Sequence, residues 1–135
     1  MVSDGKEVAF KLSDSCVLKI VQGDITNWSV DGSSDAIVNP ANGRMLGGNG
    51  ADGGVFNLQA SHVIHTVGPI YNAEKNPKKL LESAYKNSLR VAKDNNIQYI
   101  AFTAISCGIF RYPLDEAASI AISTVKQFGQ DFKEF

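Results

Sequence analysis

Residues 63–103 carry the strongest fold signal in the chain; they run VIHTVGPIYNAEKNPKKLLESAYKNSLRVAKDNNIQYIAFT. The first five, 63–67, are mostly apolar and are followed by a Gly-Pro pair, a pattern typical of a buried strand. A helix is predicted next, because Asn76 suits its N-cap and Pro77 its first position. A second strand is predicted over residues 97–103. Strand, helix and strand at this spacing indicate a parallel βαβ unit.

The predicted helix between these strands has one apolar face. Its apolar side chains recur at i, i+3, i+4, i+8 and i+11, and they are Leu81, Ala84, Tyr85, Leu89 and Ala92. The polar run from Asp94 to Asn96 is expected to end the helix.

The flanking segments extend the same plan. Residues 8–21 alternate around a Ser-Asp-Ser turn, which predicts a hairpin or two short strands, and residues 35–38 are typical of a buried strand. A second helix is expected to begin at Pro113 and to end at Gly129 as its C-cap. Its predicted apolar face consists of Ala117, Ala118, Ala121, Ile122 and Val125. The chain is therefore expected to have an α/β fold.

Length and composition are those of an ordinary globular domain. The chain has 135 residues, of which 44% are apolar and 20% charged, and its net charge is -1. Because there is no basic excess, direct nucleic-acid binding is not expected. No apolar run approaches the ~18 residues of a membrane span, and no apolar segment indicates a targeting peptide. We therefore expect a cytoplasmic or nuclear protein without a membrane partner.

The two cysteines, Cys16 and Cys107, lie far apart and form no CxxC pair. A disulfide is one interpretation, but reduced thiols are favoured. A cysteine hydrolase would use Cys107 as nucleophile and His62 or His65 as base. These histidines are three residues apart on a predicted strand and face opposite sides. That geometry disfavours both this mechanism and a His–His metal site.

Two loops are expected to carry the ligand, because parallel sheets bind ligands beyond the carboxyl ends of their strands. Residues 39–54, NPANGRMLGGNGADGG, contain six glycines, which favour a phosphate-binding nest of backbone N–H groups. A flexible linker is the other interpretation. Residues 104–113, AISCGIFRYP, join a strand to a helix N-terminus, where phosphate is favoured. Phe110 either covers a sugar or base or belongs to the core.

A third candidate is the turn GDIT at residues 23–26. Asp24 is suited to accept a hydrogen bond from the exocyclic amine of adenine, although Gly-Asp is also an ordinary turn signal. With this turn, five ordered motifs resemble the macro domain family, and most closely its MacroD-type class, including plant members. The motifs are GDIT at 23–26, DAIVNPAN at 35–42, GGNGADG at 47–53, VIHTVGP at 63–69 and AISCGIF at 104–110.

The resemblance implies a single macro domain over residues 1–135, with a three-layer α/β/α fold around a mixed, largely parallel sheet. It implies ADP-ribose or ADP-ribosylated proteins as partners, with no cofactor and no metal, and leaves the oligomeric state open. Asp24 would hold the adenine amine, and residues 106–110 would wrap the diphosphate. The full ligand set implied is Asp24, Ile25, Asn42, Gly47, Gly48, Asn49, Gly50, Ala51, Ser106, Cys107, Gly108, Ile109 and Phe110.

The MacroD-type class removes ADP-ribose from carboxylate side chains and deacetylates O-acetyl-ADP-ribose. By this resemblance, Asn42 orients the distal ribose and Asp52 activates the attacking water. A carboxylate base with nearby N–H donors suits ester hydrolysis. Two alternatives stay open: a non-catalytic ADP-ribose reader and an inactive shortened product. The preferred substrate, including ADP-ribose phosphate, is also left open.

The chain departs from the family pattern at two places. The helix, loop and strand that family members have after Gly54 are missing. The sequence also stops where the family's last strand begins, so that strand and the final helix are missing. The fold is therefore expected to be incomplete, with one sheet face lacking a helix. Since parallel sheets are normally covered on both faces, marginal stability or self-association is expected. Without its helix, Asp52 is expected to be misplaced, which weakens turnover more than binding.

Overall fold

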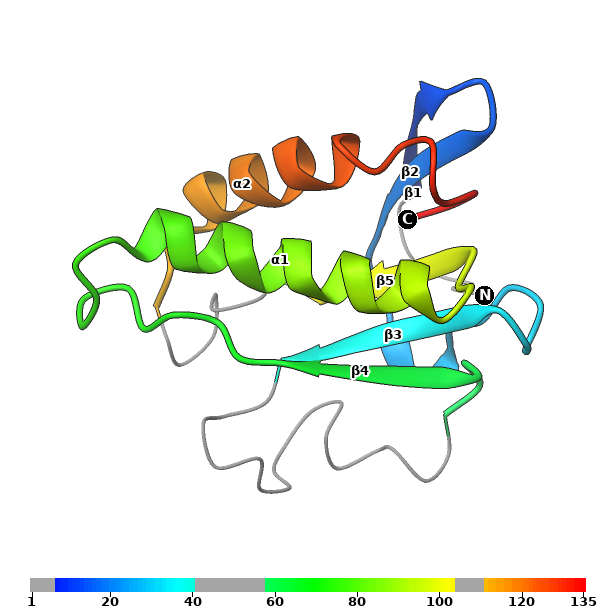
Figure 1. Ribbon diagram of the computed structural model, residues 1–135, viewed down its shortest axis with the longest axis horizontal. Helices are drawn as coiled ribbons and strands as arrows, with labels where there is room; N and C mark the ends of the chain where they lie inside the picture. Colours follow the sequence, from blue (N-terminus) through cyan, green and yellow to red (C-terminus); the bar gives the residue numbers. More distant parts are fainter. Residues whose placement is uncertain (1–6, 41–57, 104–110) are drawn as a thin grey trace.

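The computed structural model describes residues 7–40, 58–103 and 111–135, and Figure 1 shows their arrangement. After the third strand, strands and helices alternate, as expected for an α/β protein. The elements are β1 (Glu7–Ser13), β2 (Cys16–Val21), the 3₁₀ helix η1 (Ile25–Asn27), β3 (Asp35–Pro40), β4 (His62–Thr66), α1 (Pro77–Asp94), β5 (Tyr99–Phe102) and α2 (Leu114–Lys126).

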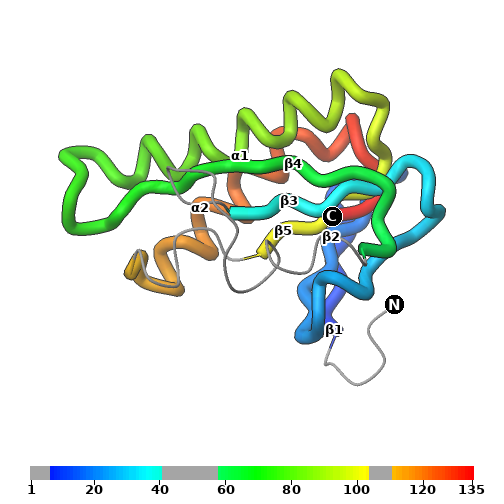
Figure 2. Tube along the Cα trace, turned by 90° about the horizontal axis from the view of Figure 1, so that it is seen from below, coloured from blue at the N-terminus to red at the C-terminus, as the bar shows by residue number. Residues whose placement is uncertain are grey.

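Three parallel strands form one part of the sheet, in the order β4-β3-β5. β1 and β2 form an antiparallel hairpin, as the alternating pattern predicted. Glu134 connects the two parts, because it forms parallel bridges with Val17 of β2 and with Tyr99 of β5. Figure 2 shows the C-terminus between these two strands. The described strands therefore form one mixed, largely parallel sheet, as predicted.

Both described helices lie on the same face of the parallel strands (Figure 1). In α1, every residue of the predicted apolar face is buried, and Leu81 and Leu89 are 0% exposed. Full burial of one leucine contributes about 2 kcal/mol. The Tyr85 ring lies against Phe102 of β5, with centroids 5.0 Å apart. The described residues thus form a helical layer on a sheet, and the second helical layer is not among them.

The ends of α1 follow the sequence prediction. The Asn76 side chain accepts a hydrogen bond from the Lys79 N–H, and Pro77 is the first helical residue. At the other end, the Ile97 N–H donates to the Ala92 carbonyl at 3.0 Å. Because Ile97 closes the helix, β5 spans only residues 99–102 and is shorter than the predicted strand 97–103.

The sequence prediction for α2 was wrong in two details. Ala118 is exposed, whereas Ile120 and Thr124 are buried. Alanine fits either side of a helix, so a run of alanines defines the buried side poorly. The C-cap is Gln127 in a right-handed conformation rather than Gly129.

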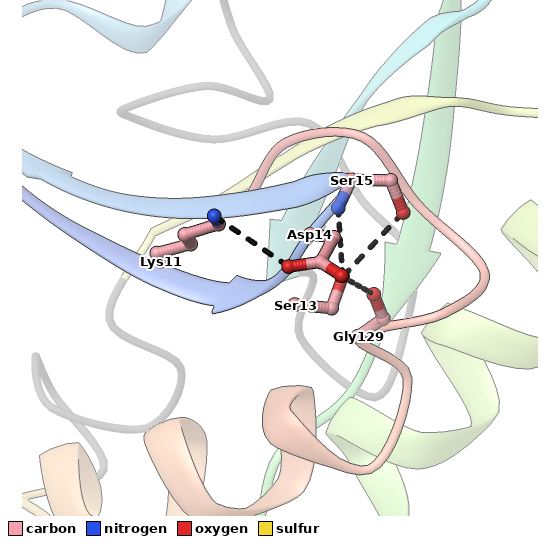
Figure 3. A network of polar contacts seen from close by, with 5 residues as sticks. All are labelled: Lys11, Ser13, Asp14, Ser15 and Gly129. Atoms are coloured by element: carbon pink, nitrogen blue, oxygen red, sulfur yellow. Dashed lines mark hydrogen bonds and ion pairs between the residues drawn. The ribbon is translucent and has the colours of Figure 1, made fainter.

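The carbonyl of Gly129 instead holds the turn between β1 and β2 (Figure 3). It accepts a hydrogen bond of 2.8 Å from the Ser13 hydroxyl, which in turn accepts from the Ser15 N–H. In the same turn, Lys11 Nζ lies 3.6 Å from the exposed Asp14 carboxylate, a type of pair that contributes little stability. Ser13 therefore fastens the hairpin to the segment that follows α2.

The sheet face opposite the helices was expected to be exposed. At β3 this prediction was wrong, because Asp35, Ile37 and Asn39 are at most 3% exposed. At the amino end of β3, Asp35 accepts hydrogen bonds from Val30, in the segment before β3, and from Ser61, in the segment before β4. These two segments cover Asp35. Towards β5 and β2 the same face opens into a cleft.

Candidate functional site

The carboxyl ends of β3 and β5 lie side by side at one edge of the sheet. Val38 pairs with Phe102, and the two strands end within two residues of this pair, at Pro40 and Phe102. The segments 41–57 and 104–110 follow these two strands. Both predicted ligand loops therefore start at the sheet edge where α/β proteins bind ligands.

Most of the predicted site residues lie outside the described residues. They are Asn42, Gly47, Gly48, Asn49, Gly50, Ala51, Asp52, Ser106, Cys107, Gly108, Ile109 and Phe110. Of the predicted set, the structure describes Asp24 and Ile25.

Asp24 lies in an exposed turn that begins η1. Its Oδ1 atom accepts two hydrogen bonds from Thr26, one from the hydroxyl at 2.6 Å and one from the N–H at 2.9 Å. These two bonds, the hydroxyl bond first, lower the pKa of the Asp24 carboxyl. Its Oδ2 atom accepts no hydrogen bond from the described residues. At neutral pH the side chain is thus an ionised acceptor with one oxygen available.

A cleft of about 720 Å³ opens beside this turn, a volume typical of sites for small molecules. It lies on the sheet face opposite the helices. Phe102 contacts α1, so the side chains on either side of it in β5 point the other way. The cleft lining includes Gln22, Gly23, Ile25, Trp28, Ala101 and Thr103. It therefore joins the Asp24 turn to the carboxyl end of β5.

The cleft also has a charged part. Lys19 Nζ lies 3.1 Å from the Glu134 carboxylate, and both residues line the cleft together with Glu7. Because Lys19 and Glu134 neutralise one another, this part offers no strong field to an anion.

The Thr103 hydroxyl lies in an energetically unfavourable position in the cleft wall. The Oγ1 atom is buried and has no hydrogen-bond partner in the part of the chain that the structure describes. An unsatisfied buried hydroxyl of this kind costs about 1–3 kcal/mol. Sequence reasoning missed Thr103, because nothing in its neighbours signals the burial.

Sequence reasoning also missed Thr26 and Trp28. A hydroxyl residue two positions after an aspartate is a signal for the observed turn, and Trp28 is the only tryptophan of the chain. Both signals were available from the sequence.

The two histidines of β4 point to opposite sides, as predicted. His62 pairs with Ala36 in the register and His65 with Asn39. The Asn39 amide nitrogen lies 3.1 Å from His65 Nδ1, which fastens the end of β3 to β4. Across residues 7–40, 58–103 and 111–135, no three His, Cys, Asp or Glu side chains gather as metal ligands.

Cys16 is a free thiol and only 1% exposed. Burial, and secondarily the Glu134 charge, raise the pKa of this thiol, so it remains protonated and unreactive at neutral pH. Cys107, the proposed nucleophile of the alternative mechanism, lies outside the described residues. Of the helices in the described ranges, none has the length and apolarity to cross a membrane.

Comparison with known proteins agrees with this architecture. A family model described as "Macro domain" matches residues 54–121. A macro domain-containing protein from Vibrio parahaemolyticus is 40% identical, with 82% of each chain aligned. The chain belongs to the macro domain family. An O-acetyl-ADP-ribose deacetylase from Salmonella typhimurium is 38% identical to this macro domain, over 82% of this chain and 78% of that protein.

A solved relative matches the fold of this macro domain closely. The Oceanobacillus iheyensis macrodomain with ADP superimposes with a TM-score of 0.86 at 31% identity, covering 98% of this chain and 87% of that one. A variant of the same protein was solved with ADPR. The mixed α/β macro domain fold expected from the sequence is thereby confirmed.

The alignment to the Vibrio protein runs over 143 residues, more than the 135 residues of this chain, yet it includes only 82% of the chain. That relative therefore contains residues without a counterpart in this macro domain. The expected position of the gap, beside Gly54, lies outside the described residues.

Proposed function

We propose that this macro domain binds ADP-ribose, free or attached to proteins, at the carboxyl edge of its sheet. The observation that carries the proposal is the Asp24 turn beside the 720 Å³ cleft. The turn offers an ionised acceptor for a base amine, and the cleft offers room for the rest of a nucleoside. The solved relative that holds ADP supports the same ligand class.

The two loops that follow β3 and β5 would bind the diphosphate. Residues 41–57 include the glycine-rich segment, whose backbone N–H groups suit phosphate. Residues 104–110 precede α2, which has Asp115 and Glu116 but no basic residue in its first turn. At the start of α2, phosphate binding would therefore depend on the backbone N–H groups of the helix N-terminus, which favour anions.

We further propose hydrolysis of ester-linked ADP-ribose. The deacetylase among the relatives supports this activity. In the proposed step, the Asp52 carboxylate takes a proton from water, and the resulting hydroxide attacks the ester. The bond between the acyl carbon and the ribose oxygen breaks, and protonated Asp52 returns its proton to that oxygen. The products are the free acid and ADP-ribose with a free hydroxyl, and the Asp52 carboxylate is regenerated. Asn42 would orient the distal ribose. Both roles rest on the family resemblance.

Calorimetric titration with ADP-ribose, with AMP as control ligand, tests the binding proposal. Saturable binding that prefers ADP-ribose is expected, and Asp24→Ala should weaken it by roughly tenfold, the value of one charge-assisted hydrogen bond. Asp14→Ala is a matched control. Asp14 is also an exposed aspartate, but it lies in the turn before β2, whereas Asp24 lies after the end of β2. A folded wild type that does not bind ADP-ribose would refute the proposal.

Asp52→Ala separates an enzyme from a reader. An enzyme loses release of ADP-ribose from a glutamate-linked substrate while it keeps ADP-ribose affinity. If the wild type binds but releases nothing, the protein is a reader. We also propose a cytoplasmic or nuclear location, where a free thiol such as Cys16 remains reduced. Imaging of the tagged protein in cells tests that location.

A further inference from the structure

Both hydrogen bonds that hold the Asp24 carboxylate come from one residue, Thr26. The hydroxyl and the N–H of Thr26 converge on Oδ1, at 2.6 and 2.9 Å. Among the described residues, no other group donates to this carboxylate. The direction of the Asp24 side chain therefore depends on Thr26.

Thr26 is itself fixed in place. Its carbonyl accepts a hydrogen bond of 3.3 Å from the Gln59 N–H, in the segment before β4. The Asn27 and Trp28 N–H groups donate to the Asp24 and Ile25 carbonyls, each at 3.1 Å, and these two bonds form η1 around Thr26. Thr26 is partly buried while Asp24 is exposed. A fixed residue thus holds a side chain that would otherwise rotate freely in solvent.

We propose that Thr26 is a positioning residue of the purine site, whose hydroxyl holds Asp24 Oδ1 so that Oδ2 accepts from a 6-amino group. The site then selects 6-amino purine nucleotides and rejects their 6-oxo counterparts. This inference rests on the proposed binding of ADP-ribose and goes beyond it, because it assigns the choice of base to the Thr26 hydroxyl.

The selection follows from the protonation state of the carboxyl group. An ionised carboxylate only accepts hydrogen bonds. A 6-amino group donates to it, whereas a 6-oxo group places an acceptor against an acceptor and leaves both without a bond. A carboxyl group that is protonated or turned away loses this discrimination. Because both Thr26 bonds are made to the charged form, they favour ionisation as well as orientation.

Three proteins test the proposal by calorimetry at pH 7: the wild type, Thr26→Val and Thr26→Ser. The ligands are ADP-ribose and its hypoxanthine counterpart, in which an oxo group replaces the 6-amino group. Thr26→Val keeps the branched shape and the N–H but removes the hydroxyl. It should bind ADP-ribose roughly three- to tenfold more weakly, and its preference for the 6-amino base should shrink by a similar factor. Thr26→Ser restores the hydroxyl and should restore both values.

Several outcomes overturn the proposal. One is a Thr26→Val protein with unchanged affinity and preference. Another is an equal loss for both ligands, which indicates a purely structural role. A third is a Thr26→Ser protein as impaired as Thr26→Val. If Thr26→Val does not give a cooperative thermal transition, Thr26→Ala takes its place under the same criteria. A wild type that binds neither ligand refutes the proposed function itself, and the inference with it.

Discussion

Among single residues, Asp35 makes the densest set of polar contacts in the described structure. It is 0% exposed at the amino end of β3. Oδ2 accepts from the N–H groups of Val30, Asp31 and Gly32 at 2.8, 3.0 and 2.8 Å, and Oδ1 accepts from the Ser61 N–H at 2.7 Å. Burial alone raises the pKa of this carboxyl, but the bonds from Ser61, Val30 and Gly32 outweigh it and lower the pKa. Backbone N–H groups thus replace water around a buried charge.

Replacing Asp35 with Asn should destabilise the protein by about 2–3 kcal/mol. The amide has one oxygen where the carboxylate has two, so its NH₂ group would face N–H donors. Urea denaturation followed by circular dichroism measures the change. Asp14→Asn, at an exposed position, should change the free energy of unfolding by less than about 0.5 kcal/mol. Equal stability of the two variants would contradict the assigned role.

The same carboxylate predicts a pH dependence. Its folded pKa is lower than its unfolded value of about 3.9. Its contribution to stability is therefore complete above the unfolded pKa and is lost as the pH falls through the folded pKa. The urea midpoint is measured from pH 7 to pH 2. In the wild type it should decrease once the pH is below about 4, and in Asp35→Asn it should decrease less steeply. Parallel curves would show that Asp35 is not responsible.

Thr103 predicts a stabilising substitution. Because its buried hydroxyl has no partner among the described residues, Thr103→Val removes a desolvation cost at nearly constant shape. The thermal midpoint should rise by an amount equivalent to about 1 kcal/mol. Thr124→Val is the matched control, because Thr124 is also buried but its hydroxyl donates to the Ile120 carbonyl at 2.7 Å. If the thermal midpoint rises for Thr124→Val but not for Thr103→Val, the assigned cost of the Thr103 hydroxyl is refuted.

At the level of secondary structure, the two helices begin differently. α1 has a side-chain N-cap and a proline at its first position, and the exposed Asn95 side chain donates to the Val91 carbonyl at its end. α2 begins after Pro113 without a side-chain cap bond. α1 is therefore specified by local chemistry, whereas α2 depends more on its packing.

Asn76→Ala should remove about 1 kcal/mol of stability, because the Lys79 N–H loses its acceptor. Thermal denaturation measures the loss. The control is Asn72→Ala, since Asn72 is exposed in the loop before the helix and makes no side-chain hydrogen bond with the described residues. An unchanged thermal midpoint for Asn76→Ala would show that the Asn76 cap does not stabilise α1.

Across the whole molecule, residues 133–135 unite the hairpin with the parallel strands. The Val17 N–H donates to the Lys133 carbonyl at 3.1 Å, and the Ile100 N–H donates to the Glu134 carbonyl, also at 3.1 Å. The Phe135 ring is 7% exposed and lies 5.2 Å from Phe132, measured between centroids. This short segment therefore contributes both backbone pairing and core packing.

Phe135→Ala should destabilise the protein by about 3–5 kcal/mol, because it removes a buried ring that packs where the two parts of the sheet meet. Urea denaturation measures the loss. Leu114→Ala is the control, since Leu114 is 69% exposed and should change stability little. A small loss for Phe135→Ala would indicate that the hairpin is held mainly by other contacts, such as that of Ser13 with Gly129.

The elements that sequence analysis predicted well have local causes. The buried face of α1, its Asn76 cap and the buried run of β3 follow from periodicity and capping over a few residues. That β3 and β5 end at the same sheet edge followed from the βαβ order alone. For the candidate site, the Asp24 turn was predictable because Thr26 lies only two residues away.

The remaining features depend on residues that are distant in sequence. The Ser13–Gly129 bond spans 116 residues, and the bridges of Glu134 bring the C-terminus between β2 and β5. Neither leaves a periodic signal, because each contact exists only when separate elements already pack together. The same reason applies to the burial of Thr103 and to the cleft beside Asp24. Local chemistry thus specified the elements and the acceptor, whereas long-range packing joined the sheet and formed the cleft.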